Sequence, residues 1–446
     1  MNSGDLVAGR FQLDERIGTG GMGVVFRALD RTSQRPVAIK ILDGRSVLDI
    51  ERARREAQAL ARLADPAIVG HVDDGVTEAG QIYLAMEWIH GITAGERISQ
   101  DGFSLREAVA LAKRVAGALA SAHGAGVLHR DIKPSNVLLP DNDPAQAMLI
   151  DFGIARITDT ISSLTRTGHA VGTPGYMAPE QARGERTITA AADVFGLGCL
   201  LYECASGQPA FSGTAPVAVI VKILMAEPTP IAEHCPEISD ELRGLLERMI
   251  CKDPARRIPD GATLARELAA LGDIADGPRR SAQHLATATR NITAITADTA
   301  HADALHCLVM ASLGRPDDPH EPPSAAELAN LRELASGHGT ALDVLATGGL
   351  IAHLAGPPAV VVRRAAELAF AMRRLLPRWS IAMTSGPASV TAVADTASSL
   401  LAGGAMADLF GKSPPGSIVV DPDTATLLAD EYDVKIGRGE VRLMLR

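Results

Sequence analysis

The chain has 446 residues, of which 46% are hydrophobic, and its formal net charge at pH 7 is −10. This composition supports packed cores, and the acidic balance argues against a general binder of nucleic acids or anionic membranes. The five cysteines show no C-x-x-C spacing, which fits a reducing cytosol better than a disulfide scaffold or a metal site.

The N-terminal region predicts a glycine-rich hairpin. Residues 1–10 form a mixed, acidic tail that lacks the basic-then-apolar order of a signal peptide. Residues 18–25, GTGGMGVV, fit the pattern G-x-G-x-x-G-x-V and join two β-like runs at 11–17 and 24–29. Glycines let such a hairpin approach phosphates without Cβ clashes. A dinucleotide-binding fold is the alternative, but it would need a helix where residues 24–26 indicate a strand.

A short apolar strand, residues 37–40, ends in Lys40, and a charged helical pattern follows at 51–63. Lys40 could be an ordinary strand lysine whose head reaches water. Paired with a carboxylate on the following helix, it would instead be aimed at the α- and β-phosphates of a nucleotide. We expect Glu56 to be that partner rather than Glu51, because Glu56 lies beside the apolar face of the helix.

The most informative stretch is HRDIKPSN at 129–136, followed by DFG at 151–153. Asp131 can accept the proton of an attacking hydroxyl, and Lys133 can neutralise charge on the transferred phosphate. Asn136 and Asp151 offer oxygen ligands for Mg²⁺. These residue types at this spacing predict phosphoryl transfer from ATP, with Mg²⁺ as the ion and Mn²⁺ as an alternative.

Residues 11–272 as a whole resemble a bacterial eukaryotic-like (Hanks-type) serine/threonine protein kinase. Further motifs carry the resemblance: APE at 178–180, DVFGLG at 193–198 and DPARR at 253–257. The resemblance implies a bilobal kinase fold in which Glu180 pairs with Arg257 and Asp193 holds the backbone of the catalytic loop. It also implies that Met86 is the gatekeeper and that adenine meets the backbone of the residues after it. The expected nucleotide-binding residues are Ile17, Gly18, Gly20, Gly23, Val25, Ala38, Lys40, Glu87 and Ile89.

The segment 151–180 is rich in threonine and serine and could be a simple polar loop. Arg130, however, precedes Asp131 and can pair with a phosphate. Thr165 and Thr167 lie at the spacing before Thr173 where related bacterial kinases autophosphorylate, so we expect phosphate on one of them to order the segment. By the same resemblance, Thr173 indicates Ser/Thr rather than Tyr substrates.

The kinase pattern stops after Leu271, and 273–300 has the composition of a linker. Residues 301–446 then predict the order βαββαβ, which is typical of a ferredoxin-like α+β sheet. The uncharged stretch 344–362 raises the question of a membrane span, but its glycines and prolines interrupt a helix. The predicted elements are strand 305–313, helix 323–338, a hairpin of 341–346 with 350–355, helix 360–376, and strands 379–384 and 388–394.

Residues 301–446 resemble a class III nucleotide cyclase domain, chiefly at 331–339, 365–376 and 415–420. Where that family has its two metal-binding aspartates, this chain has Ser312 and Gly348. The transition-state Asn and Arg of the family fall near Ser398 and Ala402. We therefore expect a cyclase-like fold that has lost its chemistry. Another βαβ regulatory domain is the alternative.

The sequence thus predicts a cytoplasmic Ser/Thr protein kinase that uses ATP and Mg²⁺, autophosphorylates and acts on protein substrates. The C-terminal domain would be regulatory or would form a homodimer, and we expect neither nucleic-acid binding nor a membrane span. A bifunctional kinase and cyclase is one alternative, and a non-catalytic scaffold is another. The missing carboxylates argue against the first, and the intact set Lys40, Glu56, Asp131, Asn136 and Asp151 argues against the second.

Overall fold

The computed structural model describes residues 1–20, 23–42, 63, 65–78, 80–152, 174–185, 187–213, 216–282, 305–313, 323–345, 348–387, 416–429, 431–436 and 441–444. Several predicted features lie outside these residues: most of the helix at 51–63 with Glu56, the threonines Thr165, Thr167 and Thr173, the strand 388–394, and the positions Ser398 and Ala402.

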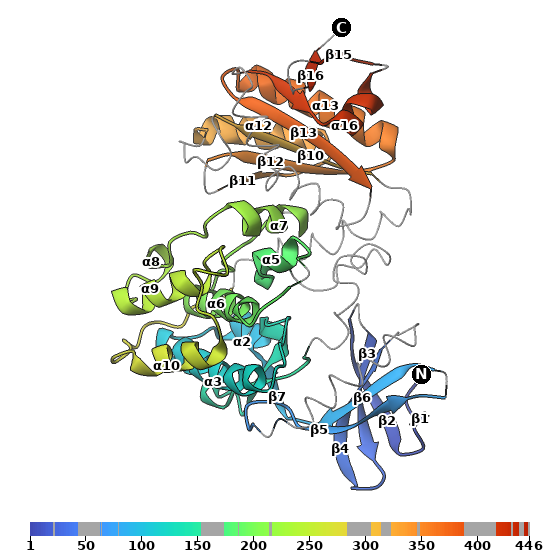
Figure 1. Ribbon diagram of the computed structural model, residues 1–446, viewed down its shortest axis with the longest axis vertical. Coiled ribbons are helices and arrows are strands. Elements are labelled where there is room, and N and C mark those ends of the chain that lie inside the picture. The colour runs from blue at the N-terminus through green and yellow to red at the C-terminus, as the bar shows by residue number, and fades with distance from the viewer. Residues whose placement is uncertain are drawn as a thin grey trace.

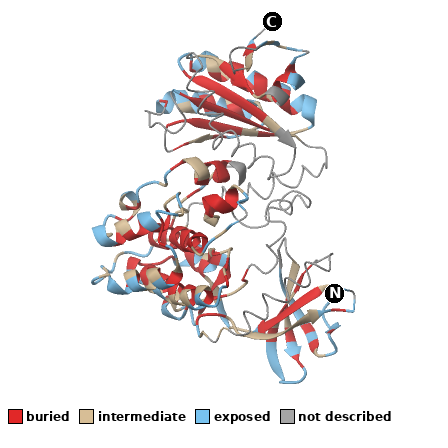
Figure 2. Ribbon diagram, in the orientation of Figure 1, coloured by how far each residue is buried: buried red, intermediate tan, exposed pale blue. Residues whose placement is uncertain are grey.

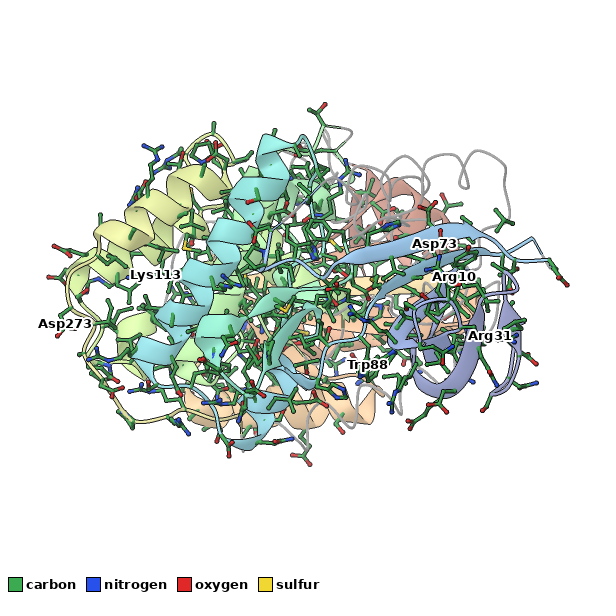
Figure 3. The ribbon with its side chains drawn as sticks, turned by 90° about the horizontal axis from the view of Figure 1, so that it is seen from below. Arg10, Arg31, Asp73, Trp88, Lys113 and Asp273 are labelled. Atoms are coloured by element: carbon green, nitrogen blue, oxygen red, sulfur yellow. The ribbon has the colours of Figure 1, made fainter. Side chains whose placement is uncertain are left out.

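The N-terminal lobe is built on an antiparallel sheet with the strand order β1-β2-β3-β4-β6-β5. Apolar residues alternate along the strands. Their side chains, such as those of Phe11 and Ile39, are buried on one face of the sheet and form the core of this lobe. The guanidinium of Arg10 donates to both carboxylate oxygens of Asp30 at 2.8 Å. It also donates to Asp73, which lies beside it in Figure 3, at 3.0 Å. The strands are β1 (Leu6–Val7), β2 (Phe11–Gly20), β3 (Gly23–Asp30), β4 (Arg35–Leu42), β5 (His71–Val76) and β6 (Ile82–Glu87).

The C-terminal lobe is helical and packs around α6 (Ala191–Ser206), in which every residue is buried. The long helix α3 (Leu105–Gly124) packs against α6 and begins with a capping box between Ser104 and Glu107. A small sheet of β7 (Gly91–Thr93), β8 (Val137–Pro140) and β9 (Met148–Leu149) carries the functional loops. The other helices are α2 (Ala94–Gln100), α5 (Pro179–Ala182), α7 (Pro216–Met225), α8 (Ile231–His234), α9 (Asp240–Met249) and α10 (Gly261–Ala270), with 3₁₀ turns η1 (Pro134–Asn136), η2 (Pro144–Gln146) and η3 (Pro174–Tyr176).

The described part of the predicted linker is attached to the C-terminal lobe. Phe103 and Arg280 exchange both backbone hydrogen bonds, at 3.3 and 2.9 Å, and Ala282 N–H donates to the carbonyl of Ile98 at 2.9 Å. The Arg280 side chain pairs with Glu237 at 2.8 Å. Gly102 has φ +67°, and a Cβ there would lie 2.1 Å from the Arg280 carbonyl oxygen. The segment 273–282, which we call the strap, therefore belongs physically to the kinase lobe.

The C-terminal domain follows the predicted order βαββαβ, and its strands β11-β12-β10-β13 are paired antiparallel. Strand β14 adds in parallel to β13, and β16 and β15 extend the sheet. The helices cover one face of the sheet, and the other face looks toward α7 of the kinase lobe (Figure 1). The elements are β10 (Leu305–Ser312), α12 (Ala325–Gly337), β11 (Leu342–Val344), β12 (Leu350–Gly356), α13 (Pro358–Leu375), β13 (Ser380–Pro387), β14 (Ile418–Val420), α16 (Pro422–Leu428), β15 (Asp433–Ile436) and β16 (Val441–Met444).

The uncharged stretch 344–362 divides between β11, β12 and the start of α13, so it forms no continuous helix. Within the described ranges, none of the helices is both long enough and apolar enough to cross a membrane.

Candidate active site

The loop between α3 and η1 is held by one buried carboxylate. Asp193, in the first turn of α6, accepts the backbone N–H of His129 at 2.8 Å and that of Arg130 at 2.6 Å. It also contacts His123 Nε2 at 2.9 Å. Because His123 Nδ1 accepts the N–H of Gly261, its Nε2 carries the proton and donates to Asp193. These contacts hold Arg130 at φ +62°, a conformation that non-glycine residues rarely adopt.

The buried ring of His129 connects the loop to the segment that precedes Phe152. The ring is fully buried, lies 4.5 Å from the Phe152 ring between centroids, and contacts the Ile150 carbonyl oxygen through Nε2 at 3.1 Å. Burial lowers the pKa of His129, so the ring is neutral at physiological pH. The imidazole therefore joins the loop to the segment of Asp151 without adding a charge.

Asp131, Lys133 and Asn136 form one hydrogen-bonded group. Lys133 Nζ donates to Asp131 Oδ2 at 2.7 Å. Asn136 Nδ2 donates to the Asp131 carbonyl at 2.8 Å and to Asp131 Oδ2 at 3.1 Å. Pro134 starts the 3₁₀ turn η1, which brings Asn136 back over Asp131. Because the amide nitrogen is used in this way, the amide oxygen of Asn136 is the atom that can meet a cation.

Lys40 and Asp151 bring the two lobes together at the site. Lys40 Nζ lies 2.9 Å from Asp151 Oδ1, and both side chains are largely shielded from solvent. Asp151 has φ +59°, and the Ile150 N–H donates to the Asn136 carbonyl at 3.0 Å. Asp151 is therefore held beside Asn136 by the backbone. Glu56, the expected partner of Lys40, lies outside the described residues.

The glycine-rich hairpin and the neighbouring strands form the other wall. Gly18 pairs with Val25 and Gly20 with Gly23 across the turn. A Cβ on Gly23 would lie 1.9 Å from the Ile41 carbonyl oxygen, whereas one on Gly18 would meet nothing within 4 Å. Gly23 is therefore required by strand packing, and Gly18 leaves open space on the hairpin.

Met86, the expected gatekeeper, and the residues after it lie along the same wall. Met86 is buried on β6 opposite Ala38 of β4, and Val25 pairs with Lys40. The Glu87 N–H donates to the Gly70 carbonyl at 2.9 Å. Ile17 is about half exposed, at 49%, and Ile89 lies just after β6.

The end of the activation segment is fixed by a buried ion pair. Arg257 donates to Glu180 at 2.7 and 3.1 Å, and both side chains are almost fully buried. Gln181 donates to the Arg130 carbonyl at 3.0 Å, which ties this segment to the catalytic loop. The structure thus brings Glu180 and Arg257 together as expected, and adds a connection through Gln181 that the motifs did not indicate.

A second buried pair was missed by sequence reasoning. The Tyr176 hydroxyl of η3 donates to Glu203 of α6. Burial raises the pKa of Glu203 from its usual 4.5 to about 7, although the bond from Tyr176 opposes this shift. Burial also raises the pKa of Tyr176 well above its usual value. An acid within the apolar run of residues 194–206 is the signal that could have identified Glu203.

The kinase-like part of the chain is similar to known proteins. Residues 11–268 match the family model described as the protein kinase domain. The chain is 36% identical to the serine/threonine-protein kinase PknB of Mycolicibacterium smegmatis over 289 residues, which are 63% of this chain and 46% of that protein. It is 36% identical to pkn3 of Myxococcus xanthus over 295 residues, 63% of this chain and 54% of that protein.

Among solved structures, the chain is similar to the Mycobacterium tuberculosis PknI kinase domain, with 26% identity and a TM-score of 0.48 over 60% of this chain and 98% of that one. The chain spans about half the length of the curated relatives it matches. Because the family model covers more than half of the 446 residues, the chain belongs to the protein kinase family.

Proposed function

We propose that this protein transfers the terminal phosphate of ATP to serine or threonine hydroxyls of proteins. The observation that carries the proposal is the convergence of Lys40, Lys133 and Asn136 on the carboxylates of Asp131 and Asp151. Members of this family use ATP with a divalent metal ion. A scaffold without activity would not need these polar groups to meet at a few ångströms.

Each side chain then has a role that follows from its contacts. Asp131 accepts the proton of the substrate hydroxyl, because its carboxylate is held toward the site by Asn136 and Lys133. Lys133 lies beside Asp131 and offsets negative charge on the phosphate that moves. Lys40 binds the phosphates that remain with the nucleotide, and the backbone of Glu87 and Ile89 binds adenine. The hairpin residues 18–25 cover the phosphates.

Asn136 and Asp151 fit a hard divalent cation. Their side chains offer one amide oxygen and one carboxylate, and Mg²⁺ is commonly bound by one or two such protein groups together with substrate phosphates. When bound, Mg²⁺ or Mn²⁺ supplies positive charge that neutralises the phosphate oxygens. The hydrogen bond from Asn136 Nδ2 to Asp131 orients the amide so that its oxygen is the ligand.

The switch that we propose acts through the activation segment. Phosphate on Thr165 or Thr167 would pair with Arg130, whose backbone is already fixed by Asp193 and Gln181. Thr173 would select Ser/Thr substrates, and Glu56 would pair with Lys40. Location in the cytoplasm stays a prediction.

We propose that residues 301–446 form a cyclase-homology domain that regulates the kinase. Ser312 is buried at the end of β10, and Gly348, at φ +89°, lies in the hairpin turn before β12. Neither residue offers a carboxylate. Within the described ranges no group of three His, Cys, Asp or Glu residues could hold a metal ion. A bifunctional enzyme is therefore the weaker alternative, and a homodimer through this domain is a further prediction.

A phosphate-transfer assay and a cyclic-nucleotide assay on the same purified protein test these proposals. Asp131→Ala should abolish transfer of radiolabelled phosphate from ATP while ATP binding is kept, because Asp131 acts on the hydroxyl and does not hold the nucleotide. The matched control is Asp276→Ala, at an exposed position of the strap. Phosphate transfer by Asp131→Ala at the rate of the unmodified chain would overturn the kinase proposal. Cyclic nucleotide formed above background with Mg²⁺ or Mn²⁺ would overturn the inactive cyclase site.

A further inference from the structure

Helix α7 is apolar on every side, which is unusual for a helix at the surface of a lobe. Its sequence is PVAVIVKILM, with Lys222 as the single charged residue. A helix with this pattern needs an apolar neighbour on each face. The side chains of the helix make three kinds of contact. Val219 and Ile223 pack into the kinase lobe. Ile220 and Leu224 pack on Ala182 and Met177, and Val221 and Met225 pack on the C-terminal domain.

The sheet of the C-terminal domain has a matching second face. Along β10, Cys307, Val309 and Ala311 point into the helical layer of that domain. The residues between them point the other way, as the two-residue period of a strand requires. This second face, which we call the α7 face, consists of Leu308, Met310, Leu345, Ile351, Ala382 and Val419, and each of these residues is at most 4% exposed.

A polar contact fixes how the two surfaces meet. Lys222 Nζ lies 3.4 Å from Asp343 Oδ1 of β11 and donates to the Ser212 carbonyl at 2.7 Å. The Lys222 and Asp343 side chains are 17% and 11% exposed, so water screens this pair only partly. The single charge of α7 therefore meets a carboxylate at the rim of the α7 face.

The same helix contacts the end of the activation segment. Ile220 and Leu224 form a cluster with Ala182 of α5 and Met177, next to the ion pair of Glu180 with Arg257. Figure 2 shows that α5 and α7 are mostly buried where the C-terminal domain lies above them. Helix α7 is thus held between the C-terminal sheet and the segment that ends the activation loop.

We propose that the α7 face docks on α7 of its own chain and braces residues 174–182, so that the C-terminal domain acts on protein-substrate binding and leaves ATP binding unchanged. This inference rests on the proposed function. While the contact is made, the α7 face is covered and two copies of the chain cannot pair through it. A homodimer would need another surface or release of the domain.

Hydrogen exchange on the full-length chain tests the docking. Ala382→Asp and Met310→Asp place a carboxylate in the α7 face, and Val360→Asp is the matched control on the far side of the domain, where the side chain is 41% exposed. Exchange of the α7 amides should become faster by about tenfold or more in the first two variants and stay unchanged in the control. Unchanged exchange in α7 would overturn the docking.

Variants at the rim of the α7 face test whether faster exchange in α7 comes from loss of the contact or from unfolding of the C-terminal domain. Asp343→Lys places two cations together and should release α7, and Lys222→Asp combined with Asp343→Lys should restore its protection. The amides of α13 report whether the C-terminal domain itself stays folded in each variant. Failure of the double variant to restore protection, with α13 protected, would contradict the assigned contact.

Kinetics on the same variants test the brace. The KM for a protein substrate should rise several-fold when α7 is released, while the KM for ATP stays the same. A released α7 with unchanged protein-substrate kinetics would overturn the brace and leave the docking standing. Hydrogen exchange needs no catalysis, so a chain that transfers no phosphate would refute the proposed function and still allow the docking to be judged.

Discussion

The catalytic loop and the C-terminal sheet are held by opposite means. In the loop, a few polar atoms each have several partners, and Asp193 alone receives three donors. In the sheet, apolar side chains point alternately to two faces along the strands, and each face is made of many such side chains. The difference indicates which substitutions should abolish activity. One substitution at a shared polar acceptor should disable the loop, whereas each apolar substitution in the C-terminal domain should remove only part of its stability.

The strongest way to test this contrast is to remove the shared acceptor. Asp193→Ala leaves the buried N–H of His129, the partly buried N–H of Arg130 and the His123 ring without their partner, and each buried orphaned donor costs about 1–3 kcal/mol. We expect loss of phosphate transfer and a lower free energy of unfolding, measured by a radiolabel assay and by urea denaturation. Asp273→Ala, at a side chain that is 91% exposed, is the control. A fully active Asp193→Ala protein would contradict the role of the carboxylate.

The buried ion pair should give the next largest effect. Arg257→Met leaves Glu180 as an uncompensated buried carboxylate, which typically lowers the free energy of unfolding by about 3–5 kcal/mol. Chemical denaturation measures this change. Arg243→Met removes an exposed pair and should cost about 0–1 kcal/mol. Equal effects of the two substitutions would show that burial does not govern these ion pairs.

In the C-terminal domain, a single cavity should have an effect confined to that domain. Leu368→Ala on α13 removes a fully buried side chain and should lower the stability of that domain by about 2–5 kcal/mol. Leu375→Ala on the same helix, at a residue that is 41% exposed, should change little. Calorimetry of the full-length chain separates the domain transitions. An unaltered transition in Leu368→Ala would contradict the packing described for this core.

The smallest expected effect is a change in pH dependence. Because the pKa of Glu203 is raised from 4.5 to about 7, the unfolded chain releases this proton first as the pH rises. Stability should therefore fall between about pH 4.5 and 7 on account of this group and level off above it. Glu203→Gln should remove this slope, as read from melting temperatures across that range, and Glu247→Gln should keep it. An unchanged slope in Glu203→Gln would assign the pH dependence to other groups.

The sequence located the residues whose chemistry demands close spacing. Asp131, Lys133 and Asn136 lie within six positions of one another, so a local motif describes their geometry. The strands of the C-terminal domain were also predictable from the sequence, because side chains that point alternately to the two faces of a sheet give a period of two. The order βαββαβ of residues 305–387 agrees with the prediction.

Local spacing did not indicate contacts between distant segments, and the two that we expected, Glu180 with Arg257 and Asp193 with the loop backbone, came from the family resemblance. Tyr176 and Glu203, and likewise His123 and Asp193, meet only after the helices have packed. Nothing in local spacing indicated that the strap returns to Phe103 or that the sheet meets α7. These pairings depend on tertiary packing, and their only trace in the sequence is a residue out of keeping with its neighbours, such as Glu203.

The strap also shortens the segment that connects the kinase lobe to the C-terminal domain. Arg280 and Ala282 are hydrogen-bonded to the kinase lobe. The connection from this point to β10 of the C-terminal domain is therefore the 22 residues 283–304. A chain extends by at most about 3.3–3.6 Å per residue, so these 22 residues limit the distance between the strap and β10 to at most about 80 Å. Short tethers give effective concentrations of the order of mM. A contact too weak to hold two separate molecules together would therefore remain closed within one chain, and a modest competing signal would suffice to open it.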